Sequence, residues 1–263
     1  MIRYLTLYLY CIRFSFSKAM EFRVDFFFRI VMDSIFYLVQ FMFFKVIYLH
    51  TNTLGGWDES QIMIFVASYI FIDALNMTIF SDNCWMMPTY INRGQLDFYL
   101  TKPVSTLFFL SLREFAANSF VNLIFATSIL IWVISNAPYD FSFLQLFLYF
   151  IFLLIGTFLY YIVHMFFILC VFWTHSSRGL SDFFWSFSHI LERPDRIYKG
   201  FLRKVLVSIL PFALMASFPT RILIEGDNMF PIIIHMTLVA IILFFIMLFI
   251  WKRGIRSYSS ASS

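Results

Sequence analysis

Long runs without a single charged residue dominate this sequence. Residues 115–139, 141–177 and 228–251 contain no aspartate, glutamate, lysine or arginine. A helix needs about 20 mostly apolar residues to cross the hydrocarbon core of a bilayer. Each of the three runs is therefore long enough to form a transmembrane helix, and this requirement limits the chain more than any other feature does.

The overall composition excludes a water-soluble domain. The chain has 263 residues, of which 61% are hydrophobic and 13% are charged, and 38 are phenylalanine. Soluble domains contain about 25% charged residues. The sequence therefore predicts an integral membrane protein. Its cysteines, Cys11, Cys84 and Cys170, form no C-x-x-C pattern, so we expect free thiols and neither a disulfide framework nor a metal site.

The hydropathy pattern predicts an all-α polytopic membrane protein with six transmembrane helices in one domain, residues 1–263. Two of the helices carry one acidic residue each, Asp33 and Asp73, and a third is short and interrupted by Pro211 and Pro219. The six expected helices cover about 27–49, 60–82, 106–135, 142–173, 203–222 and 230–251.

The distribution of charges predicts the orientation of these helices. Cytoplasmic segments carry an excess of lysine and arginine. If the N-terminus is cytoplasmic, every lysine and arginine except Lys45 and Arg221 falls on the cytoplasmic side. Both termini are then inside, with 252–263 as a cytoplasmic tail whose end we expect to be disordered. The acids near the outer face are Asp58, Glu59, Asp140, Glu225 and Asp227.

Two segments have the pattern of helices that lie on a membrane surface. In residues 1–22, Arg3 and Arg13 belong to a polar face opposite an aromatic and aliphatic face. Residues 182–192 gather phenylalanines and aliphatic residues on one side. An amphipathic helix of this kind binds at the lipid headgroups.

A short polar segment, YINRGQLDFYLTKPVS, interrupts the apolar sequence at residues 90–105. Gly94 can take the left-handed conformation that ends a helix. Residues 95–100 can then form a short new helix, which Pro103 separates from the next span. Leu96, with Tyr99 or Leu100, is then able to point into a groove on a partner. An ordinary polar loop is the alternative interpretation.

The segment GQLDFYLTKP resembles the G-x-L-D-x-x-L-x-x-P signature of ABC-2-type transporter permeases, in the branch whose permease is a separate six-span polypeptide. The resemblance extends over nearly the whole chain, in the same order. It includes Gly56-Trp57 before the second span and Arg193-Pro194 with Ile197-Tyr198 before the fifth. Pro211 and Pro219 lie within and after that fifth span.

The resemblance implies a role for each of these regions. Residues 94–103 would form the coupling helix that an ATPase subunit grips, and the interfacial helix that carries Arg3 and Arg13 would also contact the ATPase. Residues 211–228 would fold into short re-entrant helices on the outer side, although a kinked span is an alternative. The coupling residues that the resemblance implies are Gly94, Gln95, Leu96, Asp97, Tyr99, Leu100 and Pro103.

The function that the resemblance implies is that of a permease subunit of an ABC exporter in the cell (inner, cytoplasmic) membrane. Two copies of a separate ATPase would bind ATP and Mg, and a second permease, identical or paralogous, would complete the complex. The chain has no G-x-x-x-x-G-K-[ST] motif, so we expect no nucleotide-binding or enzymatic activity of its own. We expect contact with membrane lipids and no nucleic-acid partner.

Two intramembrane acids are the candidates for a translocation path. Asp73, followed by Asn76, could line such a path or form a bond between helices, and Asp33 could pair with Arg29. A proton-coupled secondary transporter that uses Asp73 and Asp33 is therefore an alternative, as is a membrane-embedded enzyme or assembly factor. His164 and His235 are expected to form hydrogen bonds between helices. The sequence does not specify a substrate.

Overall fold

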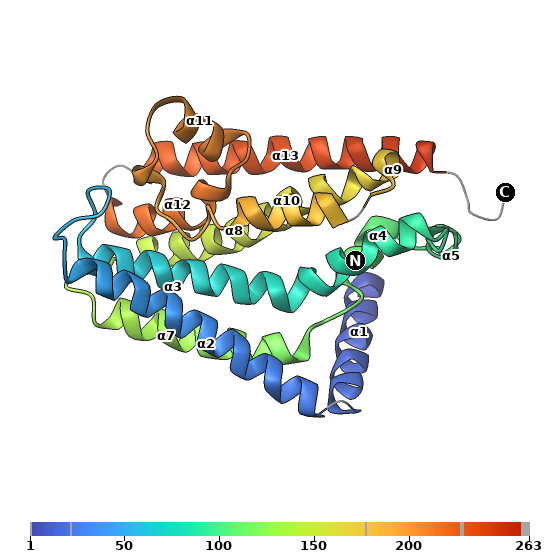
Figure 1. The fold of residues 1–263 in the computed structure, drawn as a ribbon, viewed down its shortest axis with the longest axis horizontal. Helices are drawn as coiled ribbons and strands as arrows, with labels where there is room; N and C mark the ends of the chain where they lie inside the picture. Colours follow the sequence, from blue (N-terminus) through green and yellow to red (C-terminus); the bar gives the residue numbers. More distant parts are fainter. Residues whose placement is uncertain (1, 22, 177, 227–228, 259–263) are drawn as a thin grey trace.

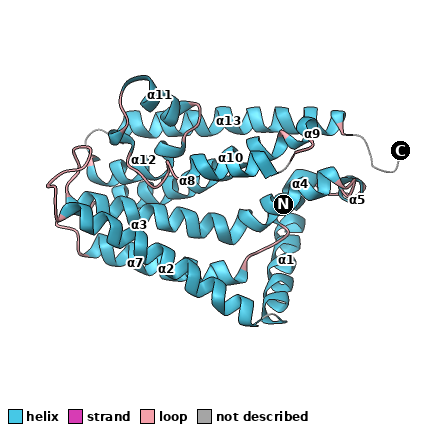
Figure 2. Ribbon diagram, viewed as in Figure 1, coloured by secondary structure: helices cyan, strands magenta, loops and turns pink. Residues whose placement is uncertain are grey.

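A computed structural model describes residues 2–21, 23–176, 178–226 and 229–258 of the chain. Within these ranges the fold consists of helices and their connections, and the only strand-type pairing is a bridge between Leu54 and Trp57 (Figures 1 and 2). The predicted all-α class is confirmed. In chain order the helices are α1 (Ile2–Glu21), α2 (Arg23–Tyr48), α3 (Glu59–Asn76), η1 (Met77–Ser81), α4 (Asp82–Asn92), α5 (Leu96–Leu100), α6 (Thr106–Leu112), α7 (Ala117–Ser135), α8 (Phe143–Leu169), α9 (Val171–Thr174), α10 (Arg178–Ser188), η2 (Asp195–Ile197), α11 (Gly200–Ser208), α12 (Phe212–Ile224) and α13 (Met229–Ser257).

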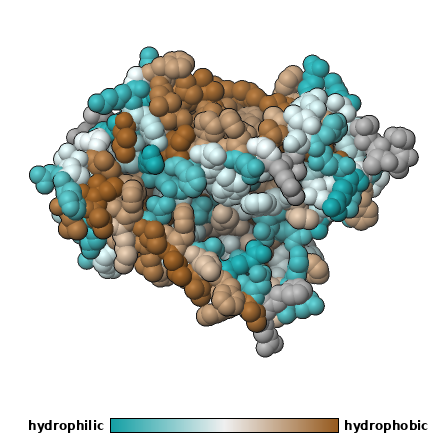
Figure 3. Space-filling view, viewed as in Figure 1, coloured by the Kyte–Doolittle hydropathy of each residue, from teal (hydrophilic) through white to brown (hydrophobic). Residues whose placement is uncertain are grey.

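Five of these segments are long and apolar enough to cross a membrane. They are Val24–Tyr48, Glu59–Asn92, Ala117–Ser135, Phe143–Thr174 and Met229–Ser257. The second of them joins α3, η1 and α4 and is the most enclosed of the five, whereas α2 and α13 turn most of their side chains outward. Figure 3 shows hydrophobic side chains along α2 and α13 and hydrophilic ones toward both ends of the bundle. This distribution fits a multi-pass membrane protein.

The third predicted span, 106–135, is two helices rather than one. α6 ends at Leu112, and α7 begins at Ala117 after a short non-helical segment. At the other end of the chain, the predicted tail is partly helical, because α13 continues to Ser257. The last residues of that tail, expected to be disordered, lie outside the described residues.

The predicted span 203–222 does not cross the bundle as one helix. α11 and α12 meet at Pro211 with a bend of 84°. Arg203 near the start of α11 and Arg221 near the end of α12 both reach Asp195, at 2.6 Å and 3.7 Å. The pair therefore leaves and returns at the same end of the bundle, as the re-entrant helices implied by the resemblance would, although it begins at residue 200.

α12 is nevertheless deeply packed between α3 and α8. The Ser68 hydroxyl of α3 lies 2.6 Å from the Tyr149 hydroxyl of α8 and 3.1 Å from Thr220 Oγ1 of α12. A Cβ atom at Gly156 of α8 would lie 2.5 Å from the Met215 carbonyl oxygen. Only glycine allows this close approach of the two helices.

Instead, the chain passes for the fifth time from one end of the bundle to the other through α10 and the irregular segment after it. This passage is called the fifth crossing below. Residues 182–192 were predicted to lie on the membrane surface, and this prediction is wrong, because α10 packs against α8 within the bundle. Phe184 is fully buried, and its ring stacks on His164 at a centroid distance of 3.9 Å. Leu180 and Val171 line the same small pocket, whereas the Phe184 ring also contacts Tyr160, so the two helices run antiparallel.

The two ends of this crossing lie at opposite ends of the bundle. Just before α10, the His175 carbonyl accepts a hydrogen bond from Asn92 at the end of α4. In η2, the Arg196 guanidinium lies 5.9 Å from the centre of the ring of Trp57, a residue of the loop that precedes α3. The cations from Arg193 to Lys204 therefore lie beyond α10, on the side of Trp57, and their predicted place beside α4 and α5 is wrong.

Candidate functional site

The short helix α5 lies at the end of the bundle where α1 and α4 meet (Figure 1). Gly94 takes the left-handed conformation, with φ +71°, and so ends α4 as its position in the sequence predicts. Ser105 then begins α6, and its hydroxyl accepts a hydrogen bond from the Phe108 amide. The polar segment is therefore a short helix held between two longer ones.

The two faces of α5 have different surroundings. Leu96 is fully buried and Tyr99 is 9% exposed, so both point into the bundle rather than toward a partner's groove. Phe98 and Leu100 are 64% and 37% exposed on the outward face. The neighbouring residues Gln95 and Pro103 are also exposed. The surface available to a partner is thus centred on Phe98.

Tyr99 connects α5 to the segment between α6 and α7. Its hydroxyl accepts a hydrogen bond from Arg113, and its ring lies 5.3 Å from the Tyr90 ring. Burial lowers the pKa of Arg113, but the nearby Tyr90, Tyr99 and Glu114 side chains raise it more, so the net shift is upward. Arg113 therefore remains charged, and the hydrogen bond to Tyr99 is charge-assisted.

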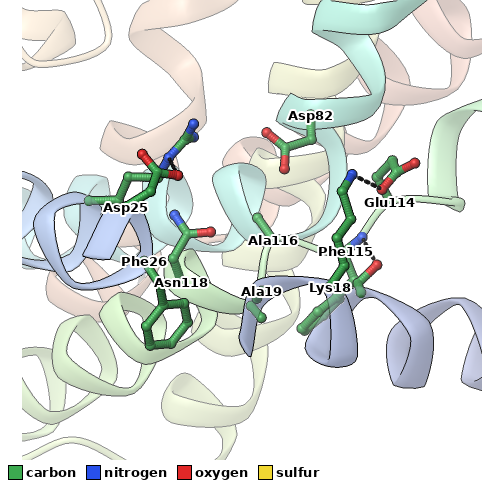
Figure 4. Close-up of a pocket in the computed structure, with 12 residues that line it drawn as sticks. Lys18, Ala19, Asp25, Phe26, Asp82, Glu114, Phe115, Ala116 and Asn118 are labelled. Atoms are coloured by element: carbon green, nitrogen blue, oxygen red, sulfur yellow. Dashed lines mark hydrogen bonds and ion pairs between the residues drawn. The ribbon is translucent and has the colours of Figure 1, made fainter. Parts of the chain in front are cut away.

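The connection continues from Arg113 to α1. Arg113 Nη2 lies 3.0 Å from Glu114 Oε1, and Lys18 Nζ of α1 lies 3.6 Å from Glu114 Oε2. Figure 4 shows this contact between Lys18 and Glu114, which both line a pocket of about 200 Å³. The Lys18 side chain is 58% exposed, so this ion pair contributes little stability. It shows that this part of α1 lies beside Glu114.

The segment Arg113–Ala116 takes its backbone hydrogen bonds from three other elements. The Glu114 amide donates to Asn83 Oδ1 of α4 at 2.9 Å. The Phe115 amide donates to Ser15 Oγ of α1 at 3.1 Å, and the Ala116 amide to the Thr78 carbonyl of η1 at 3.0 Å. Because these partners replace helical ones, the break is stable, and α1, η1 and α4 meet at it.

The N-terminal helix α1 also contacts the chain next to α5 directly. The Ser105 amide donates to the Tyr4 hydroxyl at 3.2 Å, and the Tyr4 ring meets the Phe108 ring edge-on. Arg13, predicted on the polar face, is exposed. The side chain of Arg3 lies outside the described part of the structure.

A second region of interest is a cavity of about 350 Å³ inside the bundle. It lies between α2, α3, α8 and α10, where the α10 helix gives way to irregular chain. Asp33 and Asp73 both line it. The Tyr37 hydroxyl donates to Asp73 at 3.1 Å, and Asn122 donates to Asp33 at 2.8 Å.

The sequence matches the protein family described as "ABC-2 family transporter protein" over residues 34–262. The chain belongs to the ABC-2 transporter family. No curated protein and no solved structure matches it. Family membership makes the chain a membrane transport component and implies partnership with an ABC ATPase subunit.

In this ABC-2 permease, the predicted path residues are separated. Asp73 lines the cavity, but Asn76 does not; it is 1% exposed and donates to Ser81 at 3.2 Å, next to η1. Asp33 was expected to pair with Arg29, but Arg29 instead bonds Asp25 at 2.9 Å. Asp33 is held by the Asn122 amide.

The two intramembrane histidines contact other helices in different ways. His235 of α13 lies 3.2 Å from the Val207 carbonyl of α11, which agrees with the predicted contact between helices. His164 stacks on Phe184, an aromatic contact rather than the predicted hydrogen bond.

The sequence reasoning missed most of the cavity wall. Tyr37, Tyr69, Trp185 and Glu192 all line it, and none of them was predicted to line a path. Tyr37 and Tyr69 each lie four residues from an expected intramembrane acid, which is the helical spacing that brings side chains to one face. This spacing is the signal that could have identified them.

Proposed function

We propose that this chain is the membrane-spanning permease subunit of an ABC exporter. A separate ATPase would bind at the end of the bundle that carries α1 and α5, and that end would face the cytoplasm together with both termini. The observation that carries the proposal is the connection from the exposed tip of α5, through Tyr99 and Arg113, to Glu114 and Lys18. A helix tip joined in this way can pass force into the bundle.

The geometry supports a specific route for that force. ATP and Mg bound by the ATPase close its two copies, and the closure displaces Phe98 and Leu100. Leu96 and Tyr99 are buried, so α5 moves as one piece with Arg113. The break at Arg113–Ala116 then allows α6 to shift relative to α7, and α1 shifts with it through Ser15.

The complete transporter would contain two permeases and two ATPase copies. The second permease is a further copy of this chain or a paralogue, and the path lies between the two. Alternating access by movement of rigid helix groups about a central site is known for secondary transporters, and the same logic applies to this bundle. The inner, cytoplasmic membrane of the cell is the proposed location.

Co-purification with candidate ATPases tests the proposal. We expect the solubilised wild-type chain to co-purify with one of the candidate ATPases. The Phe98→Asp variant should not co-purify with that ATPase, because a charge replaces the apolar side chain at the tip of α5. The matched control is Phe201→Asp, at a residue that is 80% exposed on α11, far from α5. Retention of the ATPase by Phe98→Asp, or retention of none by the wild type, would contradict the proposed site.

Energy dependence separates this function from its main rival. A permease driven by an ATPase stops when ATP is depleted, even while a proton gradient is maintained. Transport that survives ATP depletion, stops with the proton gradient and is lost in Asp73→Asn would support a proton-coupled transporter instead.

A further inference from the structure

The cavity between α2, α3, α8 and α10 is acidic and lies within the bundle. Three carboxylates line it, Asp33 and Asp73 on transmembrane helices and Glu192 after α10. No lysine or arginine of the described part of the chain lines it. A carboxylate within a bundle of apolar helices is costly unless it has a partner, so an acidic wall favours a positively charged occupant.

The partners that these carboxylates already have are neutral or polar. Asp33 accepts from the Asn122 amide at 2.8 Å, and Arg29 on the preceding turn of α2 acts on it only at longer range. Glu192 accepts from the Gln40 amide at 2.9 Å, and His189 Nδ1 lies 2.7 Å from its other oxygen. Among the described residues that line the cavity, only His189 could carry a positive charge, and its side chain is 65% exposed.

Two polar groups deep in the wall have bonding capacity left over. Tyr69 is 6% exposed and lines the cavity, yet its hydroxyl has no hydrogen-bond partner among the described residues. It lies close enough to Asp73 and Glu192 to interact with their charges. Asp73, 8% exposed, accepts one hydrogen bond within the described chain, from Tyr37 to Oδ2. The Tyr69 hydroxyl is therefore available to a ligand in the cavity.

Much of the remaining wall is aromatic, and it also includes Met32, Met77 and Ser188. Phe36, Tyr37 and Trp185 surround the acids, and aromatic faces bind cations as well as apolar groups. A bare metal ion is a poor fit, because no group of three or more histidine, cysteine or acidic side chains in the described residues is close enough to hold one. A volume of about 350 Å³ lies within the range of about 300 to 1,000 Å³ that is typical of small-molecule pockets.

We propose that this cavity binds an organic cation with apolar substituents, such as a hydrophobic amine or quaternary ammonium ion. Asp73 and Glu192 supply the countercharge, the Tyr69 hydroxyl oxygen accepts from the N–H of an ammonium group where the occupant is an amine, and the aromatic wall contacts the apolar groups. Such cations would be the substrates of the exporter, and this step rests on the proposed transport function. Binding of the cation to the cavity does not depend on ATP.

Binding of two probes of the same shape and opposite charge tests the inference. The full chain in lipid nanodiscs is mixed with labelled tetraphenylphosphonium or with tetraphenylborate, and uptake by empty nanodiscs is subtracted. We expect saturable binding of the cation alone. Asp73→Asn and Glu192→Gln should each weaken it about tenfold, since each removes one countercharge. Asp140→Asn, the same change in an exposed loop, should leave it unchanged.

The outcomes separate this inference from the proposed function. Equal binding of both probes, or unchanged affinity in both Asp73→Asn and Glu192→Gln, would overturn the cation site while ATPase co-purification is unaffected. Loss of ATPase co-purification with intact cation binding would overturn the permease function alone. Gel filtration and thermal unfolding of each variant show whether it is folded.

Discussion

At the scale of single residues, Tyr99 shows what the sequence could and could not reveal. The prediction of a short helix between Gly94 and Pro103 is correct, because the backbone preferences of glycine and proline act locally. The burial of Leu96 and Tyr99 depends on Tyr90 and Arg113, which belong to other helices. The sequence alone therefore located the helix but did not show which of its faces points outward.

The hydroxyl of Tyr99 gives a prediction at this scale. Tyr99→Phe keeps the ring packing and removes only the acceptor for Arg113. We expect the ATPase to remain bound, while stimulation of ATP hydrolysis by substrate falls about fivefold or more, in line with a coupling free energy of about 1 to 3 kcal/mol. The measurement is ATPase activity of the reconstituted complex with and without substrate.

A second tyrosine serves as the control for this experiment. Tyr10→Phe makes the same change on α1, at a side chain that is 65% exposed. In the Tyr10→Phe complex, substrate should stimulate ATP hydrolysis as much as it does in the wild type. Normal stimulation in Tyr99→Phe would remove the Tyr99–Arg113 bond from the coupling route.

At the scale of elements, the fifth crossing is the largest departure from the sequence prediction. Its second half carries Glu192, Asp195 and Arg196, which are too polar for a hydropathy-based span. Tertiary contacts compensate each charge: Gln40 and His189 hold Glu192, and Arg203 and Arg221 hold Asp195. Arg196 pairs with Glu225. The break at Arg113–Ala116 was missed for a related reason, since it contains no glycine or proline and its bonding partners come from distant segments.

Cysteine accessibility tests the path of this crossing. In a chain whose three unpaired native cysteines are replaced, we expect Lys199→Cys to react with an impermeant reagent from the same side as Asn52→Cys. Both residues are exposed at the Trp57 end, whereas Gln95→Cys at α5 should react only from the opposite side. If Lys199→Cys and Gln95→Cys react from the same side, α10 does not cross.

At the scale of the whole molecule, the bundle divides into three levels. α1 and α5 occupy one end, the acidic cavity lies between the ends, and the re-entrant pair α11–α12 covers the other end. The sequence predicted the all-α class, because long apolar runs determine it. It did not predict the cavity, whose walls come from four separate parts of the chain.

In a single copy of the chain, few residues pack against the outward side of α2, which forms one wall of the cavity. α2 lines the cavity, yet it is the least buried of the five long apolar helices and exposes Phe28, Ile35 and Val39. We therefore expect a second permease to pack against it. When tagged and untagged copies are co-expressed, purification through the tag should recover the untagged chain. Recovery of a different membrane protein in its place would indicate a paralogous partner, and recovery of neither would contradict a permease pair.

The π-helical turn at Met77–Ser81 has a consequence for insertions and deletions. A π turn holds one residue more than a regular turn, and each residue of an α-helix advances it by about 100°. Removing a single amino acid here would rotate α4 about its own axis and aim Trp85 and Asn83 at the wrong neighbours. Length changes should therefore be poorly tolerated within this turn, yet readily accepted among the exposed residues near Asn52, where the chain only has to connect two helices.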